Sequence, residues 1–162
     1  MTLMELIAVI VILSVLAGVA VPIYMDRTDQ ARAASARGAR GSLATAVHLH
    51  FTSEVARTGY GAFPADLDDV LETHQGDDLL NPYRDAAQPL FEVDAGATPA
   101  ELHTSDKTIE DAVGSGLGAI WYNPSNGAVR FRVPRQATAT ETLTLYNHVN
   151  MSSITSLSQT TG

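Results

Sequence analysis

The chain has 162 residues, no cysteine and a net charge of −8. The length suits one domain with one further element, and the absence of cysteine excludes both a disulfide framework and a thiolate metal site. Because an acidic surface repels phosphate, no specific nucleic-acid partner is expected.

An apolar run begins the chain. Residues 6–25 carry no charged side chain, and Glu5 stands directly before them. A helix of about 20 residues rises roughly 30 Å, the thickness of a bilayer's hydrocarbon core. A buried core helix would rarely be apolar all round in so small a domain, and a signal peptide would place a basic segment first. The run therefore predicts a membrane-spanning helix.

Helical composition continues after Pro22, and the pattern predicts an amphipathic helix over residues 26–58 that ends at the Thr-Gly-Tyr-Gly sequence. Pro22 lacks an N–H and clashes with the carbonyl of Gly18, itself a poor helix residue, so a kink or a melted stretch is predicted there. Bulky apolar side chains that could pack on a sheet recur at Leu43, Val47, Phe51 and Val55.

Residues 59–162 predict a globular domain with a small antiparallel sheet packed on the second half of the long helix. A short helix is expected to start at Pro64 or Ala65, with Leu67, Val70 and Leu71 facing inward. Strands are predicted at 89–93, in a hairpin around the Asn-Pro-Ser-Asn-Gly turn at 123–127, and at 142–149, where Leu143 and Leu145 alternate with polar residues. The Ser/Thr-rich tail, residues 152–162, is expected on the surface.

The predicted fold class is therefore α+β. It comprises a hydrophobic membrane or filament-core helix over 1–25, its amphipathic continuation over 26–58 and a globular domain over 59–162.

The first residues also carry a recognisable motif. Thr2, Leu3, Glu5, Leu6, the apolar run up to Val21, and Pro22 closely resemble the mature N-terminus of type IV pilins and type II secretion pseudopilins. The resemblance implies the pilin fold and a basic leader removed before Met1 by a prepilin peptidase, with methylation of the new amine. The precursor would lie in the inner membrane and the assembled protein in an extracellular pilus on the cell surface.

Two positions depart from the usual family pattern. Position 1 is Met where the family usually has Phe, and Met1 is also compatible with an initiator methionine and no leader. Position 14 is Ser where many members have Gly, so Ser14 is a weaker helix-breaking candidate and melting depends on Gly18 and Pro22.

Glu5 is the candidate assembly residue. Because no Lys or Arg lies within the first 25 residues, the α-amine of Met1 is the only cation there. Glu5 could meet its own amine across one helical turn or the amine of an adjacent subunit, and the resemblance implies the second. A different interpretation is a carboxylate that caps a helix N-terminus.

The resemblance implies a structural function: the major pilin of a type IV pilus, for adhesion, motility or DNA uptake. Its partners would be further copies in a helical filament, the inner membrane, the prepilin peptidase and the pilus assembly machinery. A major pseudopilin of a type II secretion system is the alternative. A single-span membrane protein that binds a ligand without polymerising is a third interpretation. No enzymatic activity and no cofactor is expected, since no nucleophile motif frames the Ser, His and Asp residues.

Three weaker signals lie outside the N-terminal motif. Major pseudopilins carry an acidic calcium loop with Asn-Pro-Tyr nearby, which makes Asp77 and Asp78 candidate calcium ligands, but the match assigns no metal site. His48 and His50 are two apart on a predicted helix and point away from each other, so they do not predict a metal pair. The Asn150-Met151-Ser152 tripeptide fits the glycosylation sequon.

Overall fold

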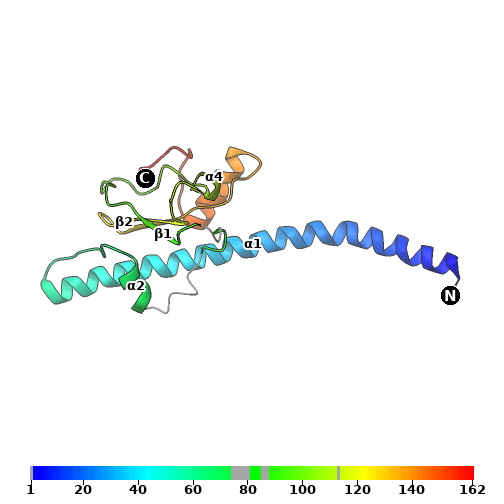
Figure 1. Cartoon of the computed structure of the whole chain (residues 1–162), viewed down its shortest axis with the longest axis horizontal. Helices are drawn as coiled ribbons and strands as arrows, with labels where there is room; N and C mark the ends of the chain where they lie inside the picture. Colours follow the sequence, from blue (N-terminus) through cyan, green and yellow to red (C-terminus); the bar gives the residue numbers. More distant parts are fainter. Residues whose placement is uncertain (1, 74–80, 85–87, 113) are drawn as a thin grey trace. The chain divides into compact units, whose positions relative to one another are not determined.

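The computed structural model describes residues 2–73, 81–84, 88–112 and 114–162. It divides into two compact units, Met1–Arg32 and Ala33–Gly162. The elements, in order, are α1 (Leu3–Thr58), α2 (Asp68–Thr73), β1 (Phe91–Val93), α3 (Ile109–Ala112), β2 (Ile120–Asn123), β3 (Ala128–Phe131) and α4 (Ala139–Asn150) (Figure 1). The coarse prediction of a long N-terminal helix with a small sheet is confirmed.

Helix α1 is the longest element, and its first part makes up the first unit. The helix runs without interruption through Gly18 and Pro22, so the single chain is not melted there. Proline removes only the hydrogen bond that its own N–H would donate, and an apolar environment favours keeping the others. Melting in a filament stays a prediction.

The sheet of the second unit has the order β1-β2-β3. Strands β2 and β3 form the predicted antiparallel hairpin, in which Ile120 pairs with Phe131 and Asn123 with Ala128. The prediction of a purely antiparallel sheet is wrong, because β1 pairs with β2 in parallel. Residues 94–119 connect these two strands and include α3, which gives the chain the long crossover that a parallel pair requires.

Residues 142–149 form part of helix α4, so the predicted third strand is wrong. Thr138 and Glu141 form a capping box, in which each side chain accepts a hydrogen bond from the other residue's backbone N–H. The buried side chains are those of Thr142, Tyr146, Val149 and Asn150, which share one face of a helix. The alternating leucines are only partly buried.

The core of the second unit lies between α1, the sheet and α4. Leu43 and Val47 on α1 are fully buried against a cluster that includes Val129 and Phe131 of β3, and Figure 1 shows this part of α1 alongside the sheet. Phe51 is half-buried and stacks on Phe63, with ring centroids 4.6 Å apart. Of the predicted apolar stripe, Leu43 and Val47 supply the buried part.

Replacing Leu43 by alanine should therefore destabilise the second unit. Loss of a fully buried leucine costs about 2–5 kcal/mol, because both the transfer energy and the packing around the cavity are lost. Leu49→Ala is the matched control on the same helix, since Leu49 is 57% exposed and its loss should change stability by at most about 0.5 kcal/mol. The fluorescence of Trp121, the only tryptophan, during denaturant unfolding would report both values. Equal effects of the two variants would contradict the packing described here.

The predicted inward face of α2 is confirmed, since Leu67 and Val70 are buried and Leu71 packs against the core, although the helix itself starts at Asp68. The expected surface position of residues 152–162 holds only in part. Ile154 is 4% exposed and belongs to the core cluster. The carbonyl of Thr160 accepts hydrogen bonds from the backbone of Leu102 and His103, which attaches this tail to the rest of the unit.

Candidate functional site: the N-terminal apolar helix

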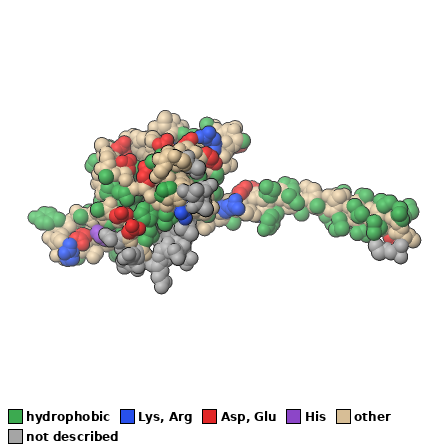
Figure 2. Space-filling model, viewed as in Figure 1, with side chains coloured by type: hydrophobic (Ala, Val, Ile, Leu, Met, Phe, Trp, Pro, Cys, Tyr) green, Lys and Arg blue, Asp and Glu red, His purple; other side chains and the backbone are tan. Residues whose placement is uncertain are grey.

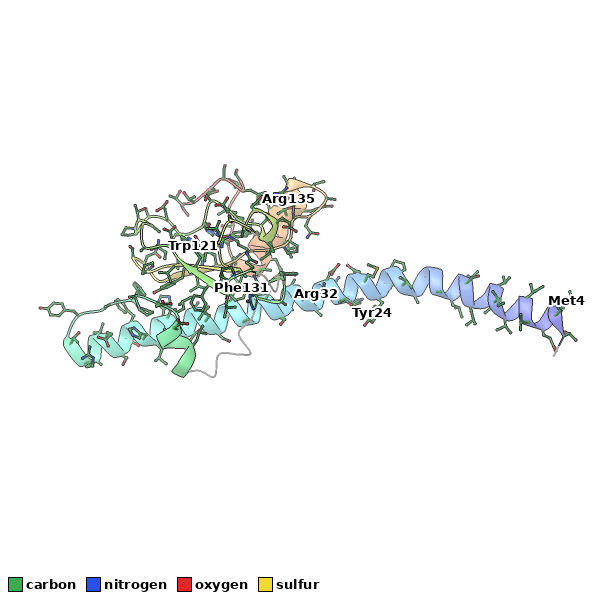
Figure 3. All side chains as sticks on the ribbon, viewed as in Figure 1. Met4, Tyr24, Arg32, Trp121, Phe131 and Arg135 are labelled. Carbon is green, nitrogen blue, oxygen red and sulfur yellow. The ribbon has the colours of Figure 1, made fainter. Side chains whose placement is uncertain are left out.

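The apolar side chains of the first unit are exposed on all sides of α1. Between Leu3 and Met25 every large apolar side chain is at least 48% exposed. Green apolar side chains cover much of this unit on the face shown in Figure 2, and Met4 and Tyr24 project from the helix in Figure 3. A helix that is apolar all round is stable only when lipid or other helices cover it. The length and composition of this segment are sufficient to cross a membrane.

The polar groups of this segment are largely satisfied within the helix itself. The Ser14 hydroxyl donates a hydrogen bond to the Val11 carbonyl, with an O–O distance of 2.8 Å. Such a bond lets a serine lie in an apolar environment at low cost, because no unpaired donor remains. Ser14 is therefore compatible with lipid or with a helix bundle, and it produces no break in the single chain.

Glu5 caps the N-terminus of α1 through hydrogen bonds with Thr2. Its carboxylate accepts hydrogen bonds from the Thr2 backbone N–H, at 2.6 Å, and from the Thr2 hydroxyl, at 3.1 Å. In return the Glu5 N–H donates to the Thr2 hydroxyl oxygen at 3.3 Å. These are the reciprocal bonds of a capping box, and the Thr-x-x-Glu spacing that makes them was readable from the sequence. In the single chain Glu5 thus acts as a capping carboxylate.

The same carboxylate is fully exposed and could change partners. Only one of its oxygens, Oε2, takes part in the bonds to Thr2. The Met1 amine, the other proposed partner, lies outside the described residues. The pairing of Glu5 with an amine of a neighbouring subunit therefore stays a prediction, and the capping bond is the interaction with which it would compete.

A polar segment follows the apolar one. Gln30 donates to the Asp26 carboxylate at 3.0 Å and accepts from the Arg27 guanidinium at 3.4 Å. These residues lie within about one helical turn of each other, which is the spacing at which helical side chains interact. Asp26 and Arg27 are the first charged side chains after the apolar segment and therefore mark its end. Long side chains such as Arg27 can keep their charge in water while their apolar stems remain against lipid.

The other sequence-predicted sites do not form a functional centre among the described residues. Asp77 and Asp78 lie outside that part of the chain. Within it, no group of three or more His, Asp or Glu residues is placed to hold a metal ion. His48 packs edge-on against the ring of Phe63, with centroids 5.9 Å apart, as part of the packing around Phe51.

Trp121 and Tyr122 on β2 lie in the interior of the second unit. Trp121 (Figure 3) is buried and donates to the Asp94 carboxylate at 3.2 Å. Tyr122 donates to the carbonyl of Pro64 at 2.7 Å. The sequon residue Asn150 is also fully buried, and its side-chain amide bonds to the backbone of Phe131. A glycosyltransferase would therefore find no accessible amide nitrogen on Asn150 in the folded unit.

Sequence reasoning missed a group of polar side chains inside the second unit. His103, Lys107 and Arg132 are each at most 3% exposed, and Arg130 and Tyr146 lie beside them. These residues come from three different segments and share no motif or spacing. Only the fold brings them together.

No family model matches the chain, and the searches of curated proteins and of solved structures found no match.

Proposed function

We propose that the chain is a structural subunit that polymerises into a helical surface filament of the type IV pilus kind. The observation that carries the proposal is the apolar helix of residues 3–25, exposed all round and started by the Thr2–Glu5 capping box. A simple membrane anchor needs no specific residue at position 5. The N-terminal motif, Thr2 to Pro22, resembles that of pilins and supports the same proposal.

The mechanism follows from the two environments that such a helix can occupy. The membrane holds each subunit by residues 6–25 until assembly. Entry into the filament exchanges lipid contacts for helix–helix contacts, with little change in hydrophobic free energy. Packing and the charge at Glu5 therefore set the axial position of each subunit. Residues 18–22 lengthen by local melting, because Pro22 leaves the Gly18 carbonyl without its helical donor.

Electron microscopy of the surface fraction sheared from cells that express the full chain tests this proposal. Long fibres made of this chain support a major pilin, and their density should show residues 18–22 without helical hydrogen bonds. Mass analysis should find Met1 as the N-terminal residue with a methylated amine. An intact helix over residues 18–22 in the fibre would contradict the melting step alone.

Two results would replace the proposal with an alternative. Short fibres that form only together with a secretion apparatus would identify a major pseudopilin of a type II secretion system. The residues Asn-Pro-Tyr at 81–83 favour that alternative, and Asn81 is buried with its amide donating to the carbonyls of Ala119 and Arg132. A chain that stays in the membrane as a monomer would be a single-span binding protein.

A further inference from the structure

The imidazole of His103 is held neutral by its two hydrogen-bonding neighbours. Its Nδ1 lies 3.2 Å from Nε of Arg130 on β3 and 3.1 Å from the hydroxyl of Tyr146 on α4. An arginine Nε always carries a hydrogen, so Nδ1 must accept that bond and cannot itself carry one. His103 is 3% exposed, which leaves almost no water to solvate a charge on the ring. The native arrangement therefore requires the tautomer that is protonated on Nε2.

The charges that face this imidazole are positive. Arg130 lies on β3, Arg40 on α1, and Lys107 in the segment before α3, where its Nζ is 5.7 Å from the centre of the Tyr146 ring. Arg132, which directly follows β3, also interacts with Tyr146, but its charge is paired with that of Glu92, at an N–O distance of 2.9 Å.

The carboxylate of Asp106, in the same segment, interacts with the ammonium of Lys107. Within the described part of the chain, no hydrogen bond or ion pair joins a carboxylate to His103. Burial, Arg130, Lys107 and Arg40 together lower the pKa of His103 from 6.5 to about 4.

The same segment holds the C-terminal tail. The backbone N–H groups of Leu102 and His103 both donate to the Thr160 carbonyl at 2.9 Å. The ammonium of Lys107 donates to the Leu157 carbonyl at 2.7 Å. Glu101 and Thr161 form an isolated β-bridge. A displacement of residues 101–107 would therefore break these attachments of residues 157–161, whereas Ile154 belongs to the core cluster and is bonded by Asn147.

We infer that His103 is an acid-sensitive latch, and that its protonation releases residues 157–162 from the second unit. A proton on Nδ1 would direct an N–H at the Arg130 N–H and place a new charge among Arg40, Lys107 and Arg130. The ring must then leave its site. Because the neighbouring backbone holds Thr160, residues 157–162 detach with it.

The direction of the pH dependence follows from proton linkage. An unfolded or released His103 has a pKa near 6.5 and binds a proton more readily than the latched one, whose pKa is about 4. The contribution of His103 to the stability of the latched state is thus constant above about pH 6.5. It decreases as the pH falls from 6.5 to 4, and it changes no further below pH 4. Burial lowers the pKa of Lys107 to about 8, so Lys107 is already charged throughout this interval.

Hydrogen exchange of the full chain in detergent micelles, measured by mass spectrometry from neutral pH to pH 4, tests the latch. After correction for the chemical exchange rate, protection of peptides from residues 157–162 should fall by about ten- to a hundredfold. His103→Gln removes the titratable group at this position, so protection should no longer change between neutral pH and pH 4. His148→Gln is the matched control, because His148 lies exposed on α4 and its loss should leave the wild-type response unchanged.

Three results would overturn the inference: constant protection of the wild-type tail, an unchanged response in His103→Gln, or a response lost in His148→Gln. If His103→Gln does not fold, 15N NMR of histidine-labelled wild type decides instead. Nδ1 of His103 should carry no proton at neutral pH, and it should gain one at the same pH at which the tail is released. Titration of His103 near pH 6.5 without release of the tail would also reject the latch.

Discussion

Replacing Glu5 by glutamine should abolish filament formation while leaving membrane insertion and the second unit unchanged. Glutamine keeps an oxygen that can accept from the Thr2 N–H, so the capping box is retained. What is lost is the negative charge that we propose pairs with the amine of a neighbouring subunit. An ammonium left unpaired in an apolar filament core costs about 3–5 kcal/mol in each subunit. The yield of sheared fibres, relative to the membrane-bound chain, measures the effect.

Thr2→Ala is the matched control for this experiment. It removes the hydroxyl that bonds to Glu5 and costs the helix start about 0.5–2 kcal/mol, but it leaves the charge in place. We expect Thr2→Ala to assemble and Glu5→Ala, which loses both charge and cap, to fail like Glu5→Gln. Wild-type fibre yield from Glu5→Gln together with failure of Thr2→Ala would show that Glu5 serves only as a helix cap.

Replacing Asn150 by alanine should destabilise the second unit by about 2–4 kcal/mol. The Asn150 side chain accepts from the Phe131 N–H at 2.7 Å and donates to the Phe131 carbonyl at 2.8 Å. It thereby satisfies the backbone of β3 on the side away from β2, in place of a further strand. Because Asn150 and Phe131 are fully buried, water cannot replace these bonds in the variant. Denaturant unfolding followed by Trp121 fluorescence gives the change in free energy.

Two further variants separate this role from glycosylation. Ser152→Ala removes the sequon but keeps Asn150, and it should cost at most about 1 kcal/mol through its lost bond to Asn147. Asn150→Asp keeps the acceptor but loses the donor to Phe131 and buries a charge, so it should destabilise at least as much as alanine. If Ser152→Ala were as destabilising as Asn150→Ala, the role assigned to the Asn150 amide would be wrong.

Local patterns were sufficient to predict the helix and the hairpin. The uncharged run of residues 6–25 and the leucine and valine spacing that follows it depend on neighbours three or four positions away, which the sequence displays directly. The turn at 123–127 joins strands that are adjacent in the chain, so its pairing needed no long-range information. The Thr2–Glu5 and Thr138–Glu141 capping boxes are equally local, and the second is a helix signal that the strand prediction for residues 142–149 overlooked.

The tertiary structure decided what depends on distant contacts. The direction of β1 was set by where residues 94–119 return to the sheet, and the strand's own residues carry no sign of it. Residues 142–149 alternate like a strand, yet helix α4 buries Tyr146 and Val149 together and brings Asn150 to β3.

His103 received its two donors from β3 and α4 in the same way. The sequence by itself determined the apolar helix and its charged start, because the interactions that form them join residues within one helical turn. Burial of polar groups depends on partners far along the chain, and only the folded unit supplied them.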